Sequence, residues 1–307
     1  MSKFTLAVLV IAFVAMTALG QGQSAPTLRI VTEDPTLPSE LFYGNIKVKP
    51  LRLRPGTNTP ITIDDADFFV SQHYIDFLGR FPDQGGLDYW AQQVAACGAD
   101  AACINSRRVG ISAAFFIENE FQQTGYYVYK LYRAALNRQP VFAEFRPDRR
   151  VVVGGTSIDA GKTDLATAFT QRAAFLQKYP ATMGRDAFVD AIIAGVQQTA
   201  GVDLSGQRSA LLSQFDAGGR AAVIKKVADD PSFSQAEYNR AFVAMQYWGY
   251  LNRDYDLGGY NFWLDVVNNR VTNNYRAMVC AFITSKEYQE RFGTTVTRTN
   301  ADCANIN

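Results

Sequence analysis

The sequence predicts a mainly α fold: an array of about four helical repeat units with a Pro-rich extended N-terminal arm and one small hairpin-like insertion. Three observations lead to this fold class. The chain has 307 residues, of which 48% are hydrophobic and 19% charged, so it can bury a substantial core. Apolar residues recur at helical spacing in four stretches between residues 65 and 292. Proline is concentrated before them, with six of the 11 prolines between Pro26 and Pro60.

Residues 1–20 have the pattern of a secretory signal peptide. Lys3 precedes an apolar run from Phe4 to Leu19, and this run is shorter than the roughly 20 residues that a membrane-spanning helix needs. Small residues at Ala18 and Gly20 predict cleavage after Gly20. We therefore expect an exported protein that is extracellular or bound at a cell surface, with the periplasm as the other compartment. We expect no transmembrane segment after cleavage.

Residues 21–64 read as an extended Pro-rich arm. Apolar and basic residues alternate from Lys47 to Pro55, and prolines interrupt the alternation. This pattern is typical of extended chain with one edge strand.

The first and fourth repeat copies are the most similar to each other. An apolar helical face in the first copy recurs 173 residues later, and a polar motif follows it at the same offset. In the first copy this motif consists of Arg80, Asp83, Gly85, Gly86 and Trp90, and in the fourth of Arg253, Asp256, Gly258, Gly259 and Trp263. Glu120 matches Glu287 at an offset of 167, so the first copy carries six additional residues.

Two less similar copies lie between these, starting at Tyr127 and Phe188. The predicted helical repeat domain covers residues 65–292 and divides into units of about 65–122, 123–180, 181–236 and 237–292. Repeats of this length are typical of helical units whose apolar faces pack on their neighbours. A polar tail is expected at residues 293–307.

The segment 141–163 interrupts the helical pattern of the second copy. Three consecutive valines, Val151 to Val153, followed by two glycines predict a short strand or hairpin. We expect Asp164 to cap a following helix over residues 165–177. The segment also imitates a phosphate-binding loop, but Thr156 stands where that motif needs its first glycine.

The repeated motif, from the first apolar helix through Arg-x-x-Asp-x-Gly-Gly to the aromatic-Trp pair, resembles the bacterial family called domain of unknown function 4214. The resemblance covers roughly residues 65–292, and copies one and four carry it best. It implies a helical module of secreted and bacterial surface proteins, distantly similar to phycobilisome linker domains, with an interaction role. It implies no catalytic residues.

The four cysteines are expected to form disulfides, because export permits them. The spacing favours Cys97–Cys103, in the segment where the six additional residues of the first copy fall, and Cys280–Cys303, which would join a helix to the tail. A zinc site is the alternative, although Cys-x5-Cys is not a usual zinc spacing.

Two recurring pairs have both a structural and a functional interpretation. Arg80 with Glu120, and Arg253 with Glu287, are expected to be ion pairs between the first and last helices of a copy rather than a ligand clamp.

Trp90 and Trp263 are expected to anchor helices in the core, with a sugar-stacking platform as the alternative. The glycines before them are expected to supply positive backbone angles in a turn.

A calcium loop is the metal site that the sequence comes closest to encoding. Counting from Asp254 places Asp256 at position 3, Gly259 at position 6 and Asp265 at position 12. Position 5 lacks an oxygen ligand, because it is Gly258, and position 12 is usually glutamate. We therefore expect no metal site and no cofactor.

Charge and composition exclude several classes of function. A formal net charge of +1 provides no basic surface for nucleic acid. The chain has one histidine, His73, and no Gly-x-Ser-x-Gly motif. We expect no enzyme but a non-catalytic exported interaction or scaffold module that binds a surface protein or polysaccharide. The alternatives are a glycan hydrolase with paired carboxylates, or a calcium-dependent surface-binding protein.

Overall fold

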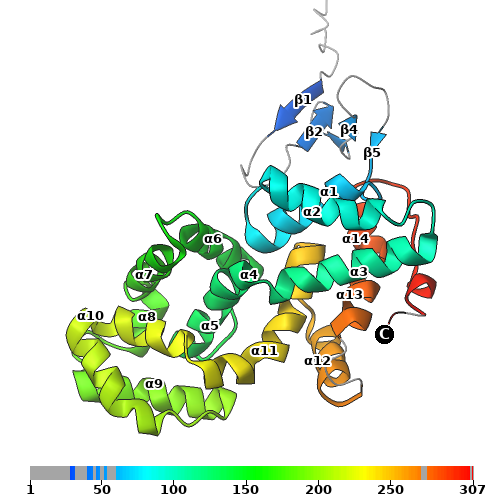
Figure 1. The fold of residues 1–307 in the computed structure, drawn as a ribbon. Helices are drawn as coiled ribbons and strands as arrows, with labels where there is room; N and C mark the ends of the chain where they lie inside the picture. The colour runs from blue at the N-terminus through cyan, green and yellow to red at the C-terminus, as the bar shows by residue number, and fades with distance from the viewer. Residues whose placement is uncertain are drawn as a thin grey trace, which may run out of the picture.

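The computed structural model describes residues 28–31, 40–43, 46–48, 52–53, 60–270, 275–304 and 306. Helices make up most of the described chain, which confirms the predicted mainly α class (Figure 1). No helix among the described residues combines the length and apolar character needed to cross a lipid bilayer. The predicted signal peptide lies outside the described residues.

Short strands precede the helices. β1 (Leu28–Val31), β2 (Glu40–Tyr43) and β3 (Ile46–Val48) form an antiparallel sheet in that order, with Leu28 opposite Tyr43. β4 (Arg52–Leu53) pairs antiparallel with β5 (Pro60–Ile61). Up to Ile61, the described residues of the predicted extended arm therefore lie in strands.

The first and fourth copies share one order of helices. The first copy contains α1 (Ala66–His73), the π-helical turn η1 (Tyr74–Leu78), α2 (Gln84–Ala95), α3 (Ala101–Ile117) and the short α4 (Asn119–Gln123). The fourth contains α11 (Pro231–Gln246), η3 (Tyr247–Leu251), α12 (Leu257–Asp265) with η4 (Val266–Arg270), α13 (Tyr275–Ile283) and the short α14 (Lys286–Glu290). A 3₁₀ turn, η5 (Asn300–Cys303), follows in the tail.

The second and third copies vary this plan. The second contains α5 (Gly125–Leu136), α6 (Phe142–Val153), α7 (Ile158–Phe169) and the short α8 (Ala173–Lys178). The third contains α9 (Arg185–Ala200), η2 (Ser205–Gln207) and α10 (Arg208–Ala228), which is kinked at Gly218 and Gly219. Its short last helix is not separate, because the first turn of α11 takes that place and continues into the fourth copy.

The predicted hairpin insertion is wrong. Val151 to Val153 form the last turn of α6, and Val152 is buried in the core. The preference of valine for strands is small and yields to packing on a neighbouring helix. The predicted cap at Asp164 is also wrong, since α7 begins at Ile158 and its cap is Ser157, which accepts a hydrogen bond from the Ala160 amide.

Two structural positions recur in all four copies, including the third, whose motif is poorest. The first helix of each copy ends at a residue with positive φ: Gly79, Asn137, Gly201 or Asn252. The third residue of each short last helix is a fully buried aromatic: Phe121, Phe175, Phe233 or Tyr288. A left-handed residue that ends the helix and a buried ring therefore define the unit more generally than the polar motif does.

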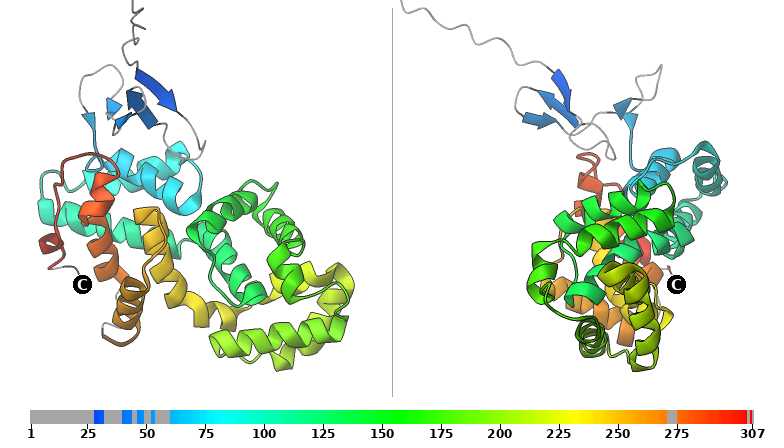
Figure 2. Two further views of the ribbon diagram at one scale, coloured as in Figure 1. Left: turned by 180° about the vertical axis from the view of Figure 1, so that it is seen from behind. Right: turned by 90° about the vertical axis from the view of Figure 1, so that its left-hand side faces the viewer.

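The chain leads away from the first copy into the second and third and then returns, so the first copy packs on the last (Figures 1 and 2). Helices α5 to α10 form one lobe, in which α10 packs on α5, α7 and α9. In the other lobe α13 packs on α3, and η1 packs on η3. The Phe77 and Tyr250 ring centroids are 4.9 Å apart at this contact, and a Cβ on Gly249 would come within 2.6 Å of Phe77.

Candidate functional site

Both recurring Arg–Glu pairs are bidentate ion pairs. Arg80 Nε and Nη2 donate to the two carboxylate oxygens of Glu120 at 2.6 and 2.7 Å. Arg253 donates to Glu287 in the same way at 2.5 and 3.0 Å. Each pair ties the end of the first helix of its copy to the short last helix, as predicted. The remaining Nη1 of each arginine donates to a backbone carbonyl, so these guanidinium groups are already occupied within the chain.

The Asp-x-Gly-Gly motif starts the second helix of both copies. Asp83 and Asp256 are N-caps that accept hydrogen bonds from the amides of Gly86 and Gly259 at 2.9 and 2.7 Å. The predicted positive backbone angles are absent from Gly85, Gly86, Gly258 and Gly259. The second glycine of each copy is needed for space instead, because a Cβ there would collide with the hydroxyl oxygen of Tyr74 or Tyr247.

This close contact predicts the effect of one methyl group. Gly259→Ala should lower the free energy of unfolding by about 1–3 kcal/mol, the range for overpacking a filled site. Tyr247→Phe removes the obstructing oxygen, so the double variant should regain most of the loss. Urea unfolding of the single and double variants measures this coupling. Gly258→Ala is the control, since its nearest neighbour would be 3.4 Å away. Equal losses with and without the tyrosine hydroxyl would contradict this explanation.

The two tryptophans of the motif are half-buried. Trp90 packs on Phe115 with 5.8 Å between ring centroids, and Trp263 packs on Phe282 at 5.9 Å. The aromatic residue before each tryptophan faces solvent, since Tyr89 is 62% exposed and Phe262 is 49% exposed. Each exposed ring lies edge-on to its tryptophan at about 5 Å. The same aromatic pair, one ring anchored and one exposed, therefore stands on α2 and α12.

The three calcium candidates have other partners. Asp254 Oδ1 accepts hydrogen bonds from the Phe142 amide at 2.7 Å and from the Trp248 indole at 3.2 Å. Asp256 caps α12, and Asp265 binds Asn269 and Arg270 at 2.8 and 2.5 Å. Within the described residues no three His, Cys, Asp or Glu side chains are close enough together to hold a metal ion.

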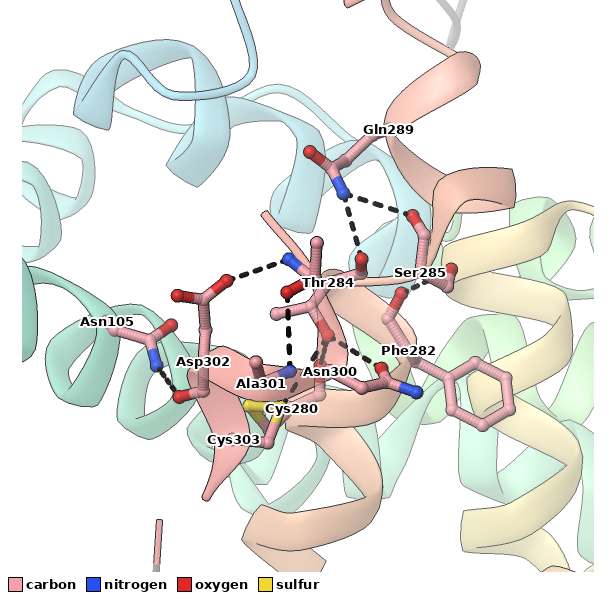
Figure 3. Close-up of a disulfide and its surroundings, with 11 residues drawn as sticks. Asn105, Cys280, Phe282, Thr284, Ser285, Gln289, Asn300, Ala301, Asp302 and Cys303 are labelled. Carbon is pink, nitrogen blue, oxygen red and sulfur yellow. Dashed lines mark hydrogen bonds between the residues drawn. A yellow bond between two sulfur atoms is a disulfide. The ribbon is translucent and has the colours of Figure 1, made fainter. Parts of the chain in front are cut away.

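The structure contains the two predicted disulfides, Cys97–Cys103 and Cys280–Cys303. The second attaches the predicted polar tail to α13 (Figure 3). Nearby, Asn105 on α3 donates to the Asp302 carbonyl, and Thr284 Oγ1 donates to Asn300 at 3.1 Å. Farther along, Arg298 pairs with Asp64 at 2.9 Å. The tail is therefore folded against the helical domain.

The segment whose sequence is similar to a phosphate-binding loop takes part in the packing of α6 on α7. A Cβ on Gly161 would collide with the backbone carbonyl of Val152, so glycine lets the two helices approach closely. Lys162 is buried and its Nζ binds Asp229 at 2.9 Å and Gln123 at 2.5 Å. This lysine is therefore occupied by groups of the chain itself.

Two buried charge clusters were not predicted from the sequence. Glu237 on α11 is fully buried and accepts hydrogen bonds from Arg133 Nε and Nη2 at 2.9 and 2.7 Å and from Tyr129 at 3.0 Å. Arg291 pairs with Asp76 at 2.9 Å and donates to the carbonyls of Gly249 and Tyr250. Neither cluster recurs among the copies, so the repeat comparison contains no signal for them.

His73 is a buried residue of the core. Its Nδ1 lies 2.8 Å from the Phe69 carbonyl and its Nε2 lies 2.8 Å from Ser112 Oγ. Gln246, its equivalent in the fourth copy, is also buried and donates to the Phe242 carbonyl at 3.1 Å. Burial lowers the pKa of His73 from 6.5 to about 3, and the charges of Arg108 and Arg291 add to this effect. The histidine is therefore neutral in the folded protein at neutral pH.

A pH dependence of stability follows. Between pH 6.5 and 3 the unfolded chain binds a proton at His73 that the folded protein does not bind. The contribution of the neutral histidine is fully present above pH 6.5 and is lost as the pH falls, at about 1.4 kcal/mol per pH unit. His73→Gln should therefore lose about 2–3 kcal/mol less than the natural protein between pH 6.5 and 4.5. Urea unfolding at both pH values tests this, and parallel pH profiles would disprove it.

The described surface includes the following open cavities. One lies between α2, α3 and α13 and is bounded by Trp90 and Arg276. A second lies between α7 and α10 and is bounded by Lys225 and Asp229. The third is a shallow depression between α1 and α2, where Asp67 and Asp88 are the two carboxylates. Asp88 accepts a hydrogen bond from Gln84 at 2.8 Å.

Residues 227–292 match the family model described as "Domain of unknown function (DUF4214)". The match extends from the end of α10 to the residues after α14, and so contains the whole fourth copy. The resemblance inferred from the motif is thus confirmed for this part of the chain. None of the curated proteins matches the chain.

Proposed function

We propose that this protein is a non-catalytic exported interaction module that binds a surface polysaccharide. The observation that carries the proposal is the repeated aromatic pair on α2 and α12, with Tyr89 and Phe262 exposed at equivalent positions. The half-buried tryptophan beside each exposed ring fixes its helix on the core. Aromatic faces bury apolar area at low cost in conformational entropy, and the apolar faces of sugar rings can stack on them.

Other features support the same role. The formal charge is close to zero, and two disulfides are typical of proteins that work outside the cytoplasm. The Arg–Glu pairs and aspartate caps of the motif make contacts within the chain, which fits a rigid framework that presents a surface.

Co-sedimentation of the exported protein with envelope fractions of its own organism tests the proposal. We expect saturable binding to a polysaccharide fraction, and the double variant Tyr89→Ala/Phe262→Ala should bind less than the natural protein. Leu176→Ala is the matched control, because Leu176 is an exposed apolar residue of the other lobe.

Three outcomes would contradict the proposal. Binding that protease treatment of the fraction abolishes would indicate a surface protein as the partner. Loss of binding in EDTA would indicate a calcium-dependent protein. Release of reducing sugar from the bound fraction would indicate a hydrolase, and Asp67 and Asp88 would then be the first carboxylates to replace.

A further inference from the structure

The cavity between the first and fourth copies has the composition of a binding site. It is an open cavity of about 490 Å³, within the range of small-molecule sites. Helix α2 contributes Trp90 and Gln93, α3 contributes Ser106, Arg107 and Gly110, and α13 contributes Arg276. It lies in the region where α3 packs on α13, and therefore joins the two most similar copies.

Two arginines give this cavity a positive charge. Among the described residues, no carboxylate lines it and neither Arg107 nor Arg276 has an ion-pair partner. Residues 271–274, just before α13, are Val-Thr-Asn-Asn and include no acid. The two guanidinium groups are thus available to an anion, in contrast to Arg80 and Arg253.

Arg276 is held in place but has unused hydrogen-bonding capacity. Its Nη2 donates to the Ser106 carbonyl at 3.3 Å, and its buried Nε has no partner among the described residues. The absence of a side chain at Gly110 leaves room for it, since a Cβ there would come within 3.3 Å of Nη1. Nη1 has no hydrogen-bond acceptor among the described residues, and an anion bound in the cavity would supply one.

The side of the cavity that the first copy provides has no equivalent in the fourth copy. Val266 and Asn274 stand in the fourth copy at the positions of Gln93 and Arg107. Cys103 lines the cavity, and its disulfide to Cys97 joins the end of α2 to the start of α3. The six additional residues of the first copy therefore help to build the wall of this cavity.

We propose that this cavity binds a carboxylate-bearing sugar residue of an acidic polysaccharide, which deepens the proposed function and rests on it. The planar guanidinium groups of Arg276 and Arg107 pair with the carboxylate, because they match its two oxygens. The sugar ring lies against Trp90, with Gln93 and Ser106 available to its hydroxyl groups. Tyr89, next to Trp90 and exposed, extends the contact to a neighbouring sugar.

Calorimetric titration with defined oligosaccharides tests this site. The probes are trimers of galacturonate, glucuronate and mannuronate, each compared with the corresponding neutral hexose trimer. We expect at least one acidic trimer to bind saturably and its neutral counterpart to bind at least about tenfold more weakly, since the carboxylate supplies charge-assisted hydrogen bonds. Arg276→Gln and Arg107→Gln should each weaken this binding, the first by about tenfold. Arg185→Gln removes the same charge from an exposed site on α9 and should leave it unchanged.

Each other outcome would overturn the proposal. These outcomes are no binding of any acidic trimer, equal binding of acidic and neutral trimers, or unchanged binding by both arginine variants. Equally tight binding of inorganic sulfate would assign the cavity to small anions. If Arg276→Gln fails to fold, binding by the Arg107→Gln variant decides the test, because Arg107 is exposed. The effect of the arginine variants on binding of the acidic trimers tests this cavity alone. Co-sedimentation that is retained and still depends on Tyr89 and Phe262 would leave the proposed function intact even if the cavity proposal fails.

Discussion

Glu237→Leu is expected to lower the free energy of unfolding by about 3–5 kcal/mol, the range for breaking a buried ion pair. The variant leaves the guanidinium of Arg133 buried beside an apolar group, and Arg133 retains its bond to the Thr199 carbonyl at 2.9 Å. Tyr129 also loses its acceptor. Because the network joins α5, α9 and α11, its loss loosens three copies at once. Urea unfolding followed by circular dichroism measures the effect.

Two further variants identify the cause. Glu290→Leu breaks the exposed pair with Lys286 and should cost less than about 1 kcal/mol. Arg133→Met in the Glu237→Leu background removes the stranded charge, and should restore much of the stability because apolar replacements of buried ion pairs are often neutral. A loss below about 1 kcal/mol for Glu237→Leu alone would show that the pair contributes no more than a surface contact.

Removing the disulfide between Cys280 and Cys303 is expected to cost about 3 kcal/mol, as loop-closure entropy predicts for cysteines 23 positions apart. The double variant Cys280→Ala/Cys303→Ala keeps an apolar side chain at the fully buried Cys280 position. The tail should then separate more readily from α3 and α13, because the contacts of Asn300 and Asp302 no longer have a covalent anchor. Thermal unfolding measures the loss.

The shorter disulfide provides the comparison. Its cysteines are six positions apart, so Cys97→Ala/Cys103→Ala should cost about 2 kcal/mol by the same relation. Faster amide exchange of the tail should appear when Cys280 and Cys303 are replaced and should be absent when Cys97 and Cys103 are. Equal protection of the tail in both double variants would contradict the anchoring role.

Contacts inside one copy could be predicted because the chain repeats them. The pairing of Arg80 with Glu120 was predicted from its recurrence as Arg253 with Glu287, and both pairs form. Contacts between copies occur once each, so Glu237 with Arg133 and Arg291 with Asp76 had no counterpart to reveal them. The same holds for the cavity, because Arg276 and Arg107 are far apart in the sequence and come together only when the first copy packs on the last.

Local preference was misleading where packing decided the outcome. Three valines predicted a strand at 151–153, but burial of Val152 between helices outweighed it. Gly86 and Gly259 suggested positive backbone angles, and neither residue has one. Glycine is needed at both positions because a Cβ would collide with a tyrosine hydroxyl group. Sequence identifies such positions as special, and only the three-dimensional neighbour gives the reason.

The packing of the first copy on the last also limits how this molecule can evolve. An open stack of helical repeats has two free ends and can gain or lose a unit without disturbing the others. Here η1 covers η3, and the Asp76–Arg291 pair joins these copies. A fifth unit inserted into the array would have to part these surfaces, so closure fixes the copy number. Sequence change is then expected in insertions such as the Cys97–Cys103 segment, which add new surface without opening the ring.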